Sequence, residues 1–497
     1  MRDLRTQLHD YVESTIERVD VDDVVAAISV GQVADPRPVS RLRPVWVAAG
    51  AALLVVLSVG VPLVFFGSGD SPTVDESAAT TAAPMIVPSA VGTWQQVRPG
   101  FVGPVDTVDG TFDMTAVGSR LFAVGFVPGE DDRQNGVVLT SDDGVNWVRL
   151  AVNDPALTLG AVLMHAATEG GPGLVAVGVG CEAETGECAL RATAWTSIDG
   201  TSWTRTPADA TAFGDGTTQT SGMAGVADTS HGLVAVGSMK HWTFDDGGVE
   251  ELVTIHPAAW ISDDGITWER SWEGTGSAVD PNELNEVHVT MDSVVEGPDG
   301  LLVGVGATLD ENGHSIATVW TSRDGRQWGR IEPGTAAFTP GTVMLDVALG
   351  EHGYVAVGSD GGTGAAIWQS PDGVTWARID TASQSFDGIR SLDSVAALDA
   401  GYITVGSRAW INGASGVLTV LTSPDGVTWD RIHSITGAYA SDVVVSDDGI
   451  AIAGGTRDGR SAAAVWFGPH LDPEAPPPEP SSTSYETTLV ESDATTT

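Results

Sequence analysis

Ser370-Pro371-Asp372-Gly373-Val374-Thr375-Trp376 is one of six copies of a short motif, Ser-x-Asp-Gly-x-x-Trp, in this chain of 497 residues. The copies recur at intervals of roughly 48 to 65 residues, which is the spacing of a repeat architecture. The chain therefore folds as an array of similar units. The other five copies begin at Ser141, Ser197, Ser262, Ser322 and Ser423.

Each copy is surrounded by apolar segments that fit β-strands. Upstream lies an apolar run that ends in glycine, as expected of a strand buried on both faces. Another strand precedes this run, a variable loop and a third strand follow it, and a fourth strand starts at the repeated tryptophan. Four strands per roughly 50 residues is typical of a propeller blade. The glycine-ended run occurs seven times, at residues 121–125, 174–178, 233–237, 301–306, 354–358, 402–406 and 450–454.

The seventh repeat has only three strands before the chain becomes rich in proline. Residues 92–97, near the start of the fold, resemble the fourth strand that follows Gly426 and include Trp94. We expect this segment to complete the last blade, because a closed ring leaves no open sheet edge. The sequence therefore predicts an all-β, seven-bladed propeller of four-stranded blades over residues 91–469.

A large apolar residue follows ten positions after the repeated tryptophan in five of the six copies. We expect these side chains to fill the seams between consecutive blades. The five are Leu157, Phe213, Phe338, Phe386 and Tyr439, and the third blade has Ala278 instead.

An uncharged run over residues 45–66 precedes the propeller. As a helix it would be about 33 Å long, enough to cross a bilayer. Arg37, Arg41 and Arg43 come before it, so the positive-inside rule places residues 1–43 in the cytoplasm and the propeller outside. A cleaved signal peptide is the alternative, but the leader and the apolar core are too long for one. We predict a transmembrane helix over residues 44–66.

The segments beside these domains have distinct compositions. Residues 2–18 have apolar positions at helical spacing, which predicts a short amphipathic helix within the cytoplasmic segment. Residues 67–90 are rich in Ser, Thr, Ala and Pro and predict a flexible stalk. Residues 470–497 are rich in Pro, Ser and Thr and predict a disordered tail. Cys181 and Cys188 are the only cysteines, and outside the cell such a close pair predicts a disulfide.

The charge balance excludes one class of partner. The chain has 23 Lys+Arg against 66 Asp+Glu, a net charge of −43, so it repels nucleic acids. Lys240 is the only lysine, and it lacks the glycine-rich setting of a phosphate loop.

The chemistry of the motif is that of a tight turn. Aspartate accepts backbone N–H groups, serine caps the turn, and glycine adopts a positive φ. Six repeated carboxylates at such positions have a structural role. They are Asp143, Asp199, Asp264, Asp324, Asp372 and Asp425.

The motif resembles the Asp-box, or bacterial neuraminidase repeat, of sialidase-like propellers over roughly residues 92–467. The usual box has one residue between Asp and Gly, whereas here the two are adjacent. Kelch-type propellers are the second match. The resemblance implies that the boxes lie on the outer rim of the propeller, away from any active site.

The resemblance does not extend to the catalytic residues of a sialidase, which needs three arginines, a tyrosine nucleophile and an acid pair. The Arg-Ile-Pro signature is absent, and residues 330–333 are only a faint echo of it. Tyr354 and Tyr402 stand in predicted core strands, and Tyr439 stands at a seam. We therefore expect no enzymatic activity.

The loops between second and third strands are where the blades differ, and exposed aromatic and polar groups there suit sugar or peptide recognition. Acidic clusters at residues 130–132 and 245–246 offer oxygen ligands for Ca²⁺, but no ligand spacing defines a site, so we expect no cofactor. The candidate ligand-binding residues are Lys240, His241, Trp242, Phe244, Asp245, Asp246 and His256 in the third blade, His314 in the fourth, and Arg408 and Trp410 in the sixth.

These observations predict a single-pass bacterial membrane protein whose extracytoplasmic propeller is a binding or scaffold module for a protein or glycan. One alternative is a transmembrane sensor in which residues 1–43 engage a cytoplasmic partner. A second alternative is a glycan-active hydrolase.

Overall fold

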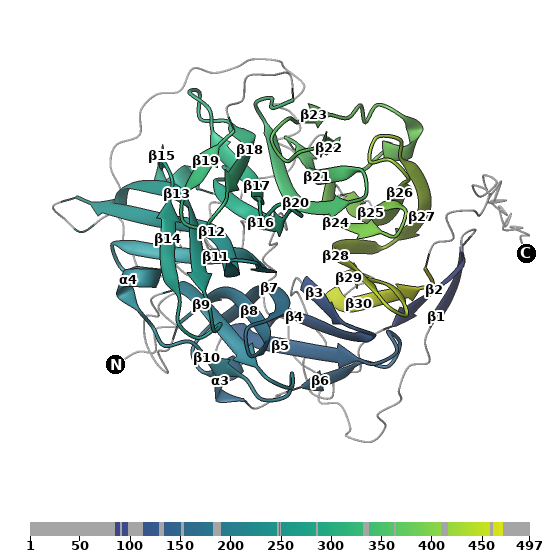
Figure 1. Cartoon of the computed structure of the whole chain (residues 1–497), viewed down its shortest axis with the longest axis horizontal. Helices are drawn as coiled ribbons and strands as arrows, with labels where there is room; N and C mark the ends of the chain where they lie inside the picture. The colour runs from purple at the N-terminus through teal and green to yellow at the C-terminus, as the bar shows by residue number, and fades with distance from the viewer. Residues whose placement is uncertain are drawn as a thin grey trace, which may run out of the picture. The chain divides into compact units, whose positions relative to one another are not determined.

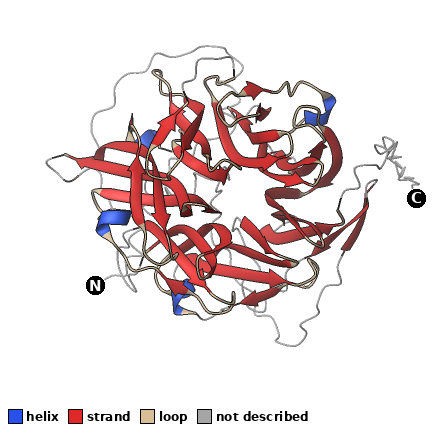
Figure 2. Ribbon diagram, in the orientation of Figure 1, coloured by secondary structure: helices blue, strands red, loops and turns tan. Residues whose placement is uncertain are grey.

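Seven β-sheets arranged around a central axis form the propeller (Figures 1 and 2). The computed structural model describes residues 85–89, 92–97, 113–128, 134–150, 154–181, 190–245, 248, 250–284, 287–331, 337–361, 364–408, 416–457 and 461–470. The prediction of an all-β, seven-bladed propeller with four-stranded blades is confirmed. The first strand of each blade lies nearest the centre in Figure 1.

Blades one to four follow one another along the chain, and in each the strands pair antiparallel in chain order. Blade one contains β3 (Asp113–Val117), β4 (Arg120–Pro128), β5 (Gln134–Ser141) and β6 (Val148–Leu150). Blade two contains β7 (Val162–Gly170), β8 (Gly173–Gly180), β9 (Arg191–Ser197) and β10 (Thr204–Arg205). Blade three contains β11 (Gln219–Thr229), β12 (Gly232–Phe244), β13 (Glu250–Ser262), β14 (Glu269–Glu273) and an added β15 (Ser277–Val279). Blade four contains β16 (Thr290–Glu296), β17 (Leu302–Leu309), β18 (Ser315–Ser322) and β19 (Trp328–Arg330).

The remaining blades complete the ring. Blade five contains β20 (Thr342–Gly350), β21 (Gly353–Asp360), β22 (Gly364–Ser370) and β23 (Ala377–Arg378). Blade six contains β24 (Ser391–Leu398), β25 (Gly401–Arg408), β26 (Val417–Ser423) and β27 (Asp430–Thr436). Blade seven contains β28 (Ala438–Ser446), β29 (Gly449–Arg457) and β30 (Ser461–Gly468). Four short helical turns are α3 (Pro155–Thr158), α4 (Ala210–Phe213), η3 (Pro281–Glu283) and η4 (Gln384–Phe386).

An N-terminal strand closes the seventh blade, as the sequence predicts. Strand β2 (Gly92–Val97) pairs with β30, which places Gln96 opposite Trp466. Trp94 is 1 % exposed and packs in the core cluster shared by blades six and seven. A further strand, β1 (Met85–Ser89), pairs with the outer edge of β2. The prediction that these residues belong to a flexible stalk is therefore wrong.

The repeated motif forms the same turn six times. In every copy serine Oγ lies 3.1–3.3 Å from an aspartate oxygen. In the copy at Ser370, Asp372 Oδ1 accepts the N–H groups of Val374 and Thr375 at 2.9 and 2.6 Å. The indole N–H of Trp376 donates to the carbonyl of Gly373 at 3.0 Å, so the tryptophan also fastens the turn.

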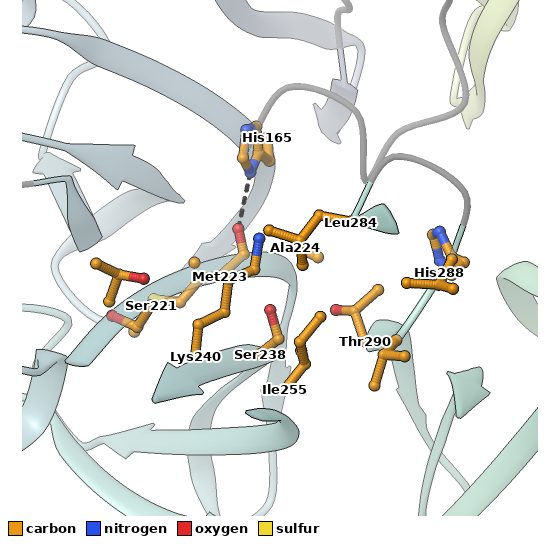
Figure 3. A pocket seen from close by; sticks show the side chains of 14 residues that line it. His165, Ser221, Met223, Ala224, Ser238, Lys240, Ile255, Leu284, His288 and Thr290 are labelled. Atoms are coloured by element: carbon orange, nitrogen blue, oxygen red, sulfur yellow. Dashed lines mark hydrogen bonds between the residues drawn. The ribbon is translucent and has the colours of Figure 1, made fainter. Parts of the chain in front are cut away.

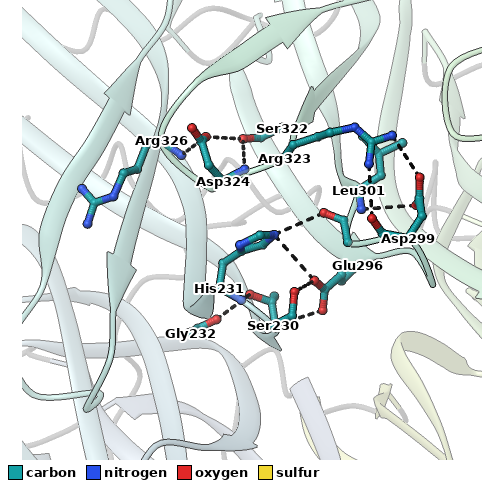
Figure 4. Close-up of polar contacts among 12 residues, drawn as sticks. Ser230, His231, Gly232, Glu296, Asp299, Leu301, Ser322, Arg323, Asp324 and Arg326 are labelled. Atoms are coloured by element: carbon teal, nitrogen blue, oxygen red, sulfur yellow. Dashed lines mark hydrogen bonds and ion pairs between the residues drawn. The ribbon is translucent and has the colours of Figure 1, made fainter.

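The turn between β18 and β19 of blade four shows the contacts of the aspartate carboxylate (Figure 4). Asp324 is exposed and accepts the N–H of Arg326, whereas Ser322 and Trp328 are buried. The adjacent Arg323 pairs with Asp299 at 2.9 Å. The carboxylate is thus used within its own turn.

Glycine in the motif is required for two reasons. Gly200 has φ 75°, a region that side chains disfavour, and a Cβ there would lie 2.4 Å from the Phe122 ring of the preceding blade. The glycine of the turn therefore packs in close contact with the preceding blade.

Four of the five predicted seam residues lie between blades. At the fifth seam it is Ala438, and not the adjacent Tyr439, that packs in the core cluster shared by blades six and seven. Leu157 packs with Val138 of blade one and Trp195 of blade two. Phe213, Phe338 and Phe386 are also buried between consecutive blades. Ala278 of the third blade is exposed in β15, which pairs with β13. The extra strand explains why this seam departs from the pattern.

A belt of hydrogen bonds joins the first strands around the ring. Asp113, Asp346, Ser394 and Asp442 hold equivalent positions, each opposite the residue that precedes the repeated glycine of the second strand. Their oxygens accept N–H groups of the next blade, as Asp442 Oδ2 does from Met114 at 2.7 Å. Ser394 Oγ also contacts Asp442 Oδ1 at 2.7 Å and Asp346 Oδ2 at 3.0 Å.

Burial makes this belt sensitive to protonation. Desolvation raises the pKa of Asp442 to about 6, with a contribution from the charge of Asp346. Desolvation, together with the charge of Asp442, also raises the pKa of Asp113 well above its usual value. Burial likewise raises the pKa of Asp346. These three carboxylates, of which Asp442 is buried and the other two are half-buried, therefore favour bound protons.

Several sequence predictions concern other parts of the chain. The cytoplasmic segment, the transmembrane helix over residues 44–66 and the tail beyond residue 470 lie outside the described residues. Within the described part of the chain, no helix has the length and apolar character needed to span a membrane. Cys188 also lies outside it, so the disulfide with the buried Cys181 stays a prediction.

Candidate functional site

A small pocket lies beside the first strand of blade three (Figure 3). Its walls come from β7, β11, β12, β13 and the segment that leads into β16. The cavity volume is about 50 Å³, which is space for roughly three or four water molecules. The polar side chains that line it are His165, Thr220, Ser221, Ser238, Lys240, His288 and Thr290.

Strand β12 brings Lys240 into this pocket. Lys240 pairs with Thr220 of β11 and Ile255 of β13, so its side chain shares a sheet face with those two lining residues. Figure 3 shows its nitrogen pointing to the side where His165 lies. Among the described residues, no carboxylate forms an ion pair with it. Burial lowers the pKa of Lys240 to about 8, because the charged amine loses water without gaining a counter-charge.

Two histidines flank the lysine. His165 Nδ1 lies 2.9 Å from the carbonyl oxygen of Met223, and burial lowers its pKa. His288 Nε2 lies 2.7 Å from Asp292 Oδ2. Burial opposes the charge on His288, but the charge and hydrogen bond of Asp292 outweigh it and raise the pKa of His288. Burial also raises the pKa of Asp292.

β-Bulges place several of these groups. The first strands have an extra residue at one position, which is His165 in β7, Ala224 in β11 and Asp292 in β16. A bulge turns a side chain away from the regular ladder. His165 and Ala224 therefore line the pocket, and Asp292 holds His288 at its wall. None of these residues was predicted from the sequence, because the bulges become visible only in the strand pairing.

The candidate residues of the third blade separate onto two faces of one hairpin. Lys240 and Trp242 share a face, where Trp242 donates its indole N–H to Thr220 Oγ1 at 2.9 Å. His241 and His256 lie on the other face, close to Glu273. Phe244 and Asp245 are exposed near the hairpin tip, and Asp246 lies outside the described residues.

The remaining candidates do not join this pocket. His314 is exposed beside Asp310, with 3.6 Å between Nδ1 and Oδ2. Arg408 is exposed at the end of β25, and Trp410 lies outside the described residues. The structure thus brings Lys240 together with His165 and His288, and does not place His314 or Arg408 among the lining residues.

Tyr354 and Tyr402 occupy the core positions expected of them. Tyr354 is 3 % and Tyr402 0 % exposed, and the hydroxyl of Tyr402 donates to the Gly353 carbonyl at 2.7 Å. Tyr439 is half-buried beside Ala438 at the start of β28.

Comparisons with known proteins show the fold alone. No family model and no curated protein matches the chain. It is similar to a protein of unknown function from Dyadobacter fermentans, with 14% identity, a TM-score of 0.41, and coverage of 76% of this chain and 98% of that one. It is also similar to Trypanosoma rangeli sialidase in complex with sialic acid, with 13% identity, a TM-score of 0.36 and coverage of 79% and 60%. A puromycin hydrolase gives 12% identity, a TM-score of 0.44 and coverage of 79% and 58%. The chain thus spans less than two thirds of each of these last two proteins.

Proposed function

We propose that the propeller is a binding module, not an enzyme, and that it takes a small anionic ligand in the pocket around Lys240. The ligand class is one that carries a carboxylate or a similar oxyanion. The observation that carries this proposal is the single lysine of the chain, which lines a pocket with no ion-pair partner among the described residues.

The electrostatics favour an anion. A half-buried amine without a counter-charge is costly, and a bound carboxylate would offset that cost by charge-assisted hydrogen bonds. His165 and His288 add donors on the walls, and the hydroxyls of Ser238 and Thr290 add more. The surrounding protein is strongly acidic, so selectivity for an anion must come from this local set of groups.

The pocket does not favour glycoside hydrolysis. That chemistry uses two carboxyl groups on opposite sides of the bond that is cleaved. None of the residues that line the pocket in the described structure is an aspartate or a glutamate. The cavity is also much smaller than the hundreds of Å³ typical of a site for a drug-sized ligand. These features support binding of a small ion or the charged end of a longer molecule.

The proposal also covers two features predicted from the sequence, the type of the repeated turn and the membrane anchor. We infer that the turn belongs with the shortened Asp-box of sialidase-like propellers, on the contacts of its Ser, Asp and Gly residues. We also infer that residues 44–66 anchor the propeller outside the cell, on the uncharged run and the preceding arginines. Protease added to intact cells should remove the propeller and spare residues 1–43. Protection of both parts would contradict this topology.

Calorimetric titration of the full chain with acetate and with phosphate tests the binding proposal. The wild-type protein should bind at least one of these probes at a single site. The Lys240→Met substitution keeps the length of the side chain and removes the charge, so binding should weaken at least about tenfold, or 1.4 kcal/mol. Arg408→Met is the matched control, because it removes an exposed cation that does not line the pocket. Equal affinities of the wild type and Lys240→Met would contradict the proposal.

A further inference from the structure

Three potential metal ligands lie on one face of blade three, opposite Lys240. They come from three neighbouring strands: His241 from β12, His256 from β13 and Glu273 from β14. His256 pairs with Met239, two residues before His241, and Glu273 pairs with Ala258, two residues after His256. Alternation along each strand therefore puts all three side chains on the same face as diagonal neighbours.

The ligand atoms are already close together. His241 Nε2 lies 2.8 Å and His256 Nδ1 lies 3.4 Å from Glu273 Oε1. The two imidazole rings have their centroids 4.7 Å apart, and the ligand atoms of the three residues all lie within 4.8 Å of one another. A tetrahedral zinc ion with bonds of about 2.0–2.2 Å holds its ligands about 3.3–3.6 Å apart. Small side-chain rotations would bring these atoms to that spacing.

Without a metal, one of the three potential ligand atoms has no hydrogen-bond partner. His241 Nε2 is a buried atom that has no hydrogen bond, since its approach to Glu273 lacks the direction of one. Arg270 Nη1 lies 3.3 Å from Glu273 Oε2, on the oxygen that the histidines do not approach. A metal on Oε1 would leave Arg270 in place as the partner of the other oxygen.

One contact must change when a metal binds. His256 Nδ1 also lies 2.9 Å from the carbonyl oxygen of Gly274, so this nitrogen carries the ring proton in the metal-free state. A metal bound at Nδ1 requires the other neutral tautomer, in which the proton lies on Nε2, so binding must break the contact with Gly274.

The structure assigns a zinc-binding site to His241, His256 and Glu273. Two imidazoles and one carboxylate are ligands that Zn²⁺ prefers, whereas Ca²⁺ and Mg²⁺ prefer all-oxygen sets. Three protein ligands leave a fourth position open for water or a ligand atom. The site lies on the face opposite the Lys240 pocket, so it goes beyond the proposed function and does not depend on it.

Zinc titration of the full chain, produced without a polyhistidine tag and stripped with a chelator, tests this assignment. We expect one Zn²⁺ per chain, and visible absorption typical of tetrahedral coordination when Co²⁺ is used instead. His241→Ala and Glu273→Gln should each weaken Zn²⁺ binding at least about 100-fold, because removal of a ligand costs no less than removal of an outer partner.

Two controls make the result decisive. His314→Ala removes an exposed histidine far along the chain and should leave Zn²⁺ affinity unchanged. Lys240→Met should also leave it unchanged, which separates this site from the anion pocket. Circular dichroism identifies variants that fail to fold. If a variant is unfolded, the Co²⁺ spectrum of the wild type tests the assignment in its place. Absence of stoichiometric binding to the wild type, or equal affinity in folded His241→Ala and Glu273→Gln variants, would overturn the assignment.

Discussion

Single residues in the repeated turn decide whether neighbouring blades fit together. We predict that Gly200→Ala lowers the free energy of unfolding by about 2–4 kcal/mol, from a strained positive φ and a clash with Phe122. Chemical denaturation monitored by tryptophan fluorescence measures this. Gly329→Ala is the matched control, because a Cβ there would meet nothing within 4 Å. Equal losses in the two variants would refute the close-contact explanation.

Residues of the site were predictable only where they stood out in the sequence. Lys240 was notable as the only lysine of the chain, and it does line the pocket. The long loop predicted around it was wrong, because β12 and β13 extend there as a paired hairpin. His165 and His288 gave no comparable signal, because a lone histidine in or before a strand is most often a packed core residue. Their role depends on bulges and on contacts between blades that no local pattern specifies.

At the scale of the element, strand β2 closes the ring, so its loss should measurably lower the stability of the propeller. We predict that Trp94→Ala lowers the free energy of unfolding by about 3–5 kcal/mol, because a fully buried indole leaves a cavity. Deletion of residues 85–89, which form β1, should cost less, because β1 adds to a blade that already has four strands. If Trp94→Ala is as stable as the wild type in equilibrium unfolding, β2 does not complete the blade.

Most elements could be predicted because each blade repeats the same pattern of buried strands and turns. The departures were not predictable for physical reasons. Strand β1 contains Pro88, and its segment has a composition typical of a linker, but an edge strand needs only backbone pairing. Strand β15 forms where the third blade lacks its large seam residue and pairs with the long β13. Both depend on partners distant in sequence.

For the whole molecule, the buried belt predicts an unusual response to pH. Because the pKa of Asp442 is about 6 in the folded protein and about 4 when unfolded, the folded state binds more protons between these values. For Asp442 alone, stability should therefore rise by about 1–1.5 kcal/mol as pH falls from 7.5 to 5. Below about pH 4 the trend reverses, because N–H groups of Thr201 and Ser202 lower the pKa of Asp199 to about 2 and that stabilisation is lost on protonation.

Melting temperatures of the wild type and of Asp442→Asn across this pH range measure the contribution of the belt carboxylates to the pH dependence. The variant should show a flatter profile between pH 7.5 and 5 than the wild type, because it no longer titrates at that position. Asp430→Asn removes the same charge at an exposed position of β27 and should keep the wild-type slope. A wild-type melting temperature that is constant or falls from pH 7.5 to 5 would count against the belt.

The most direct test of the proposed function is the titration of Lys240 itself. Because the chain has one lysine, labelling lysine with ¹³C at Cε gives a single side-chain signal in the NMR spectrum of the full chain. We predict a pKa of about 8 for Lys240 in the free protein and a clear rise when a binding anion, acetate or phosphate, is added. A pKa near the ordinary value of about 10.4, unchanged by either anion, would contradict it.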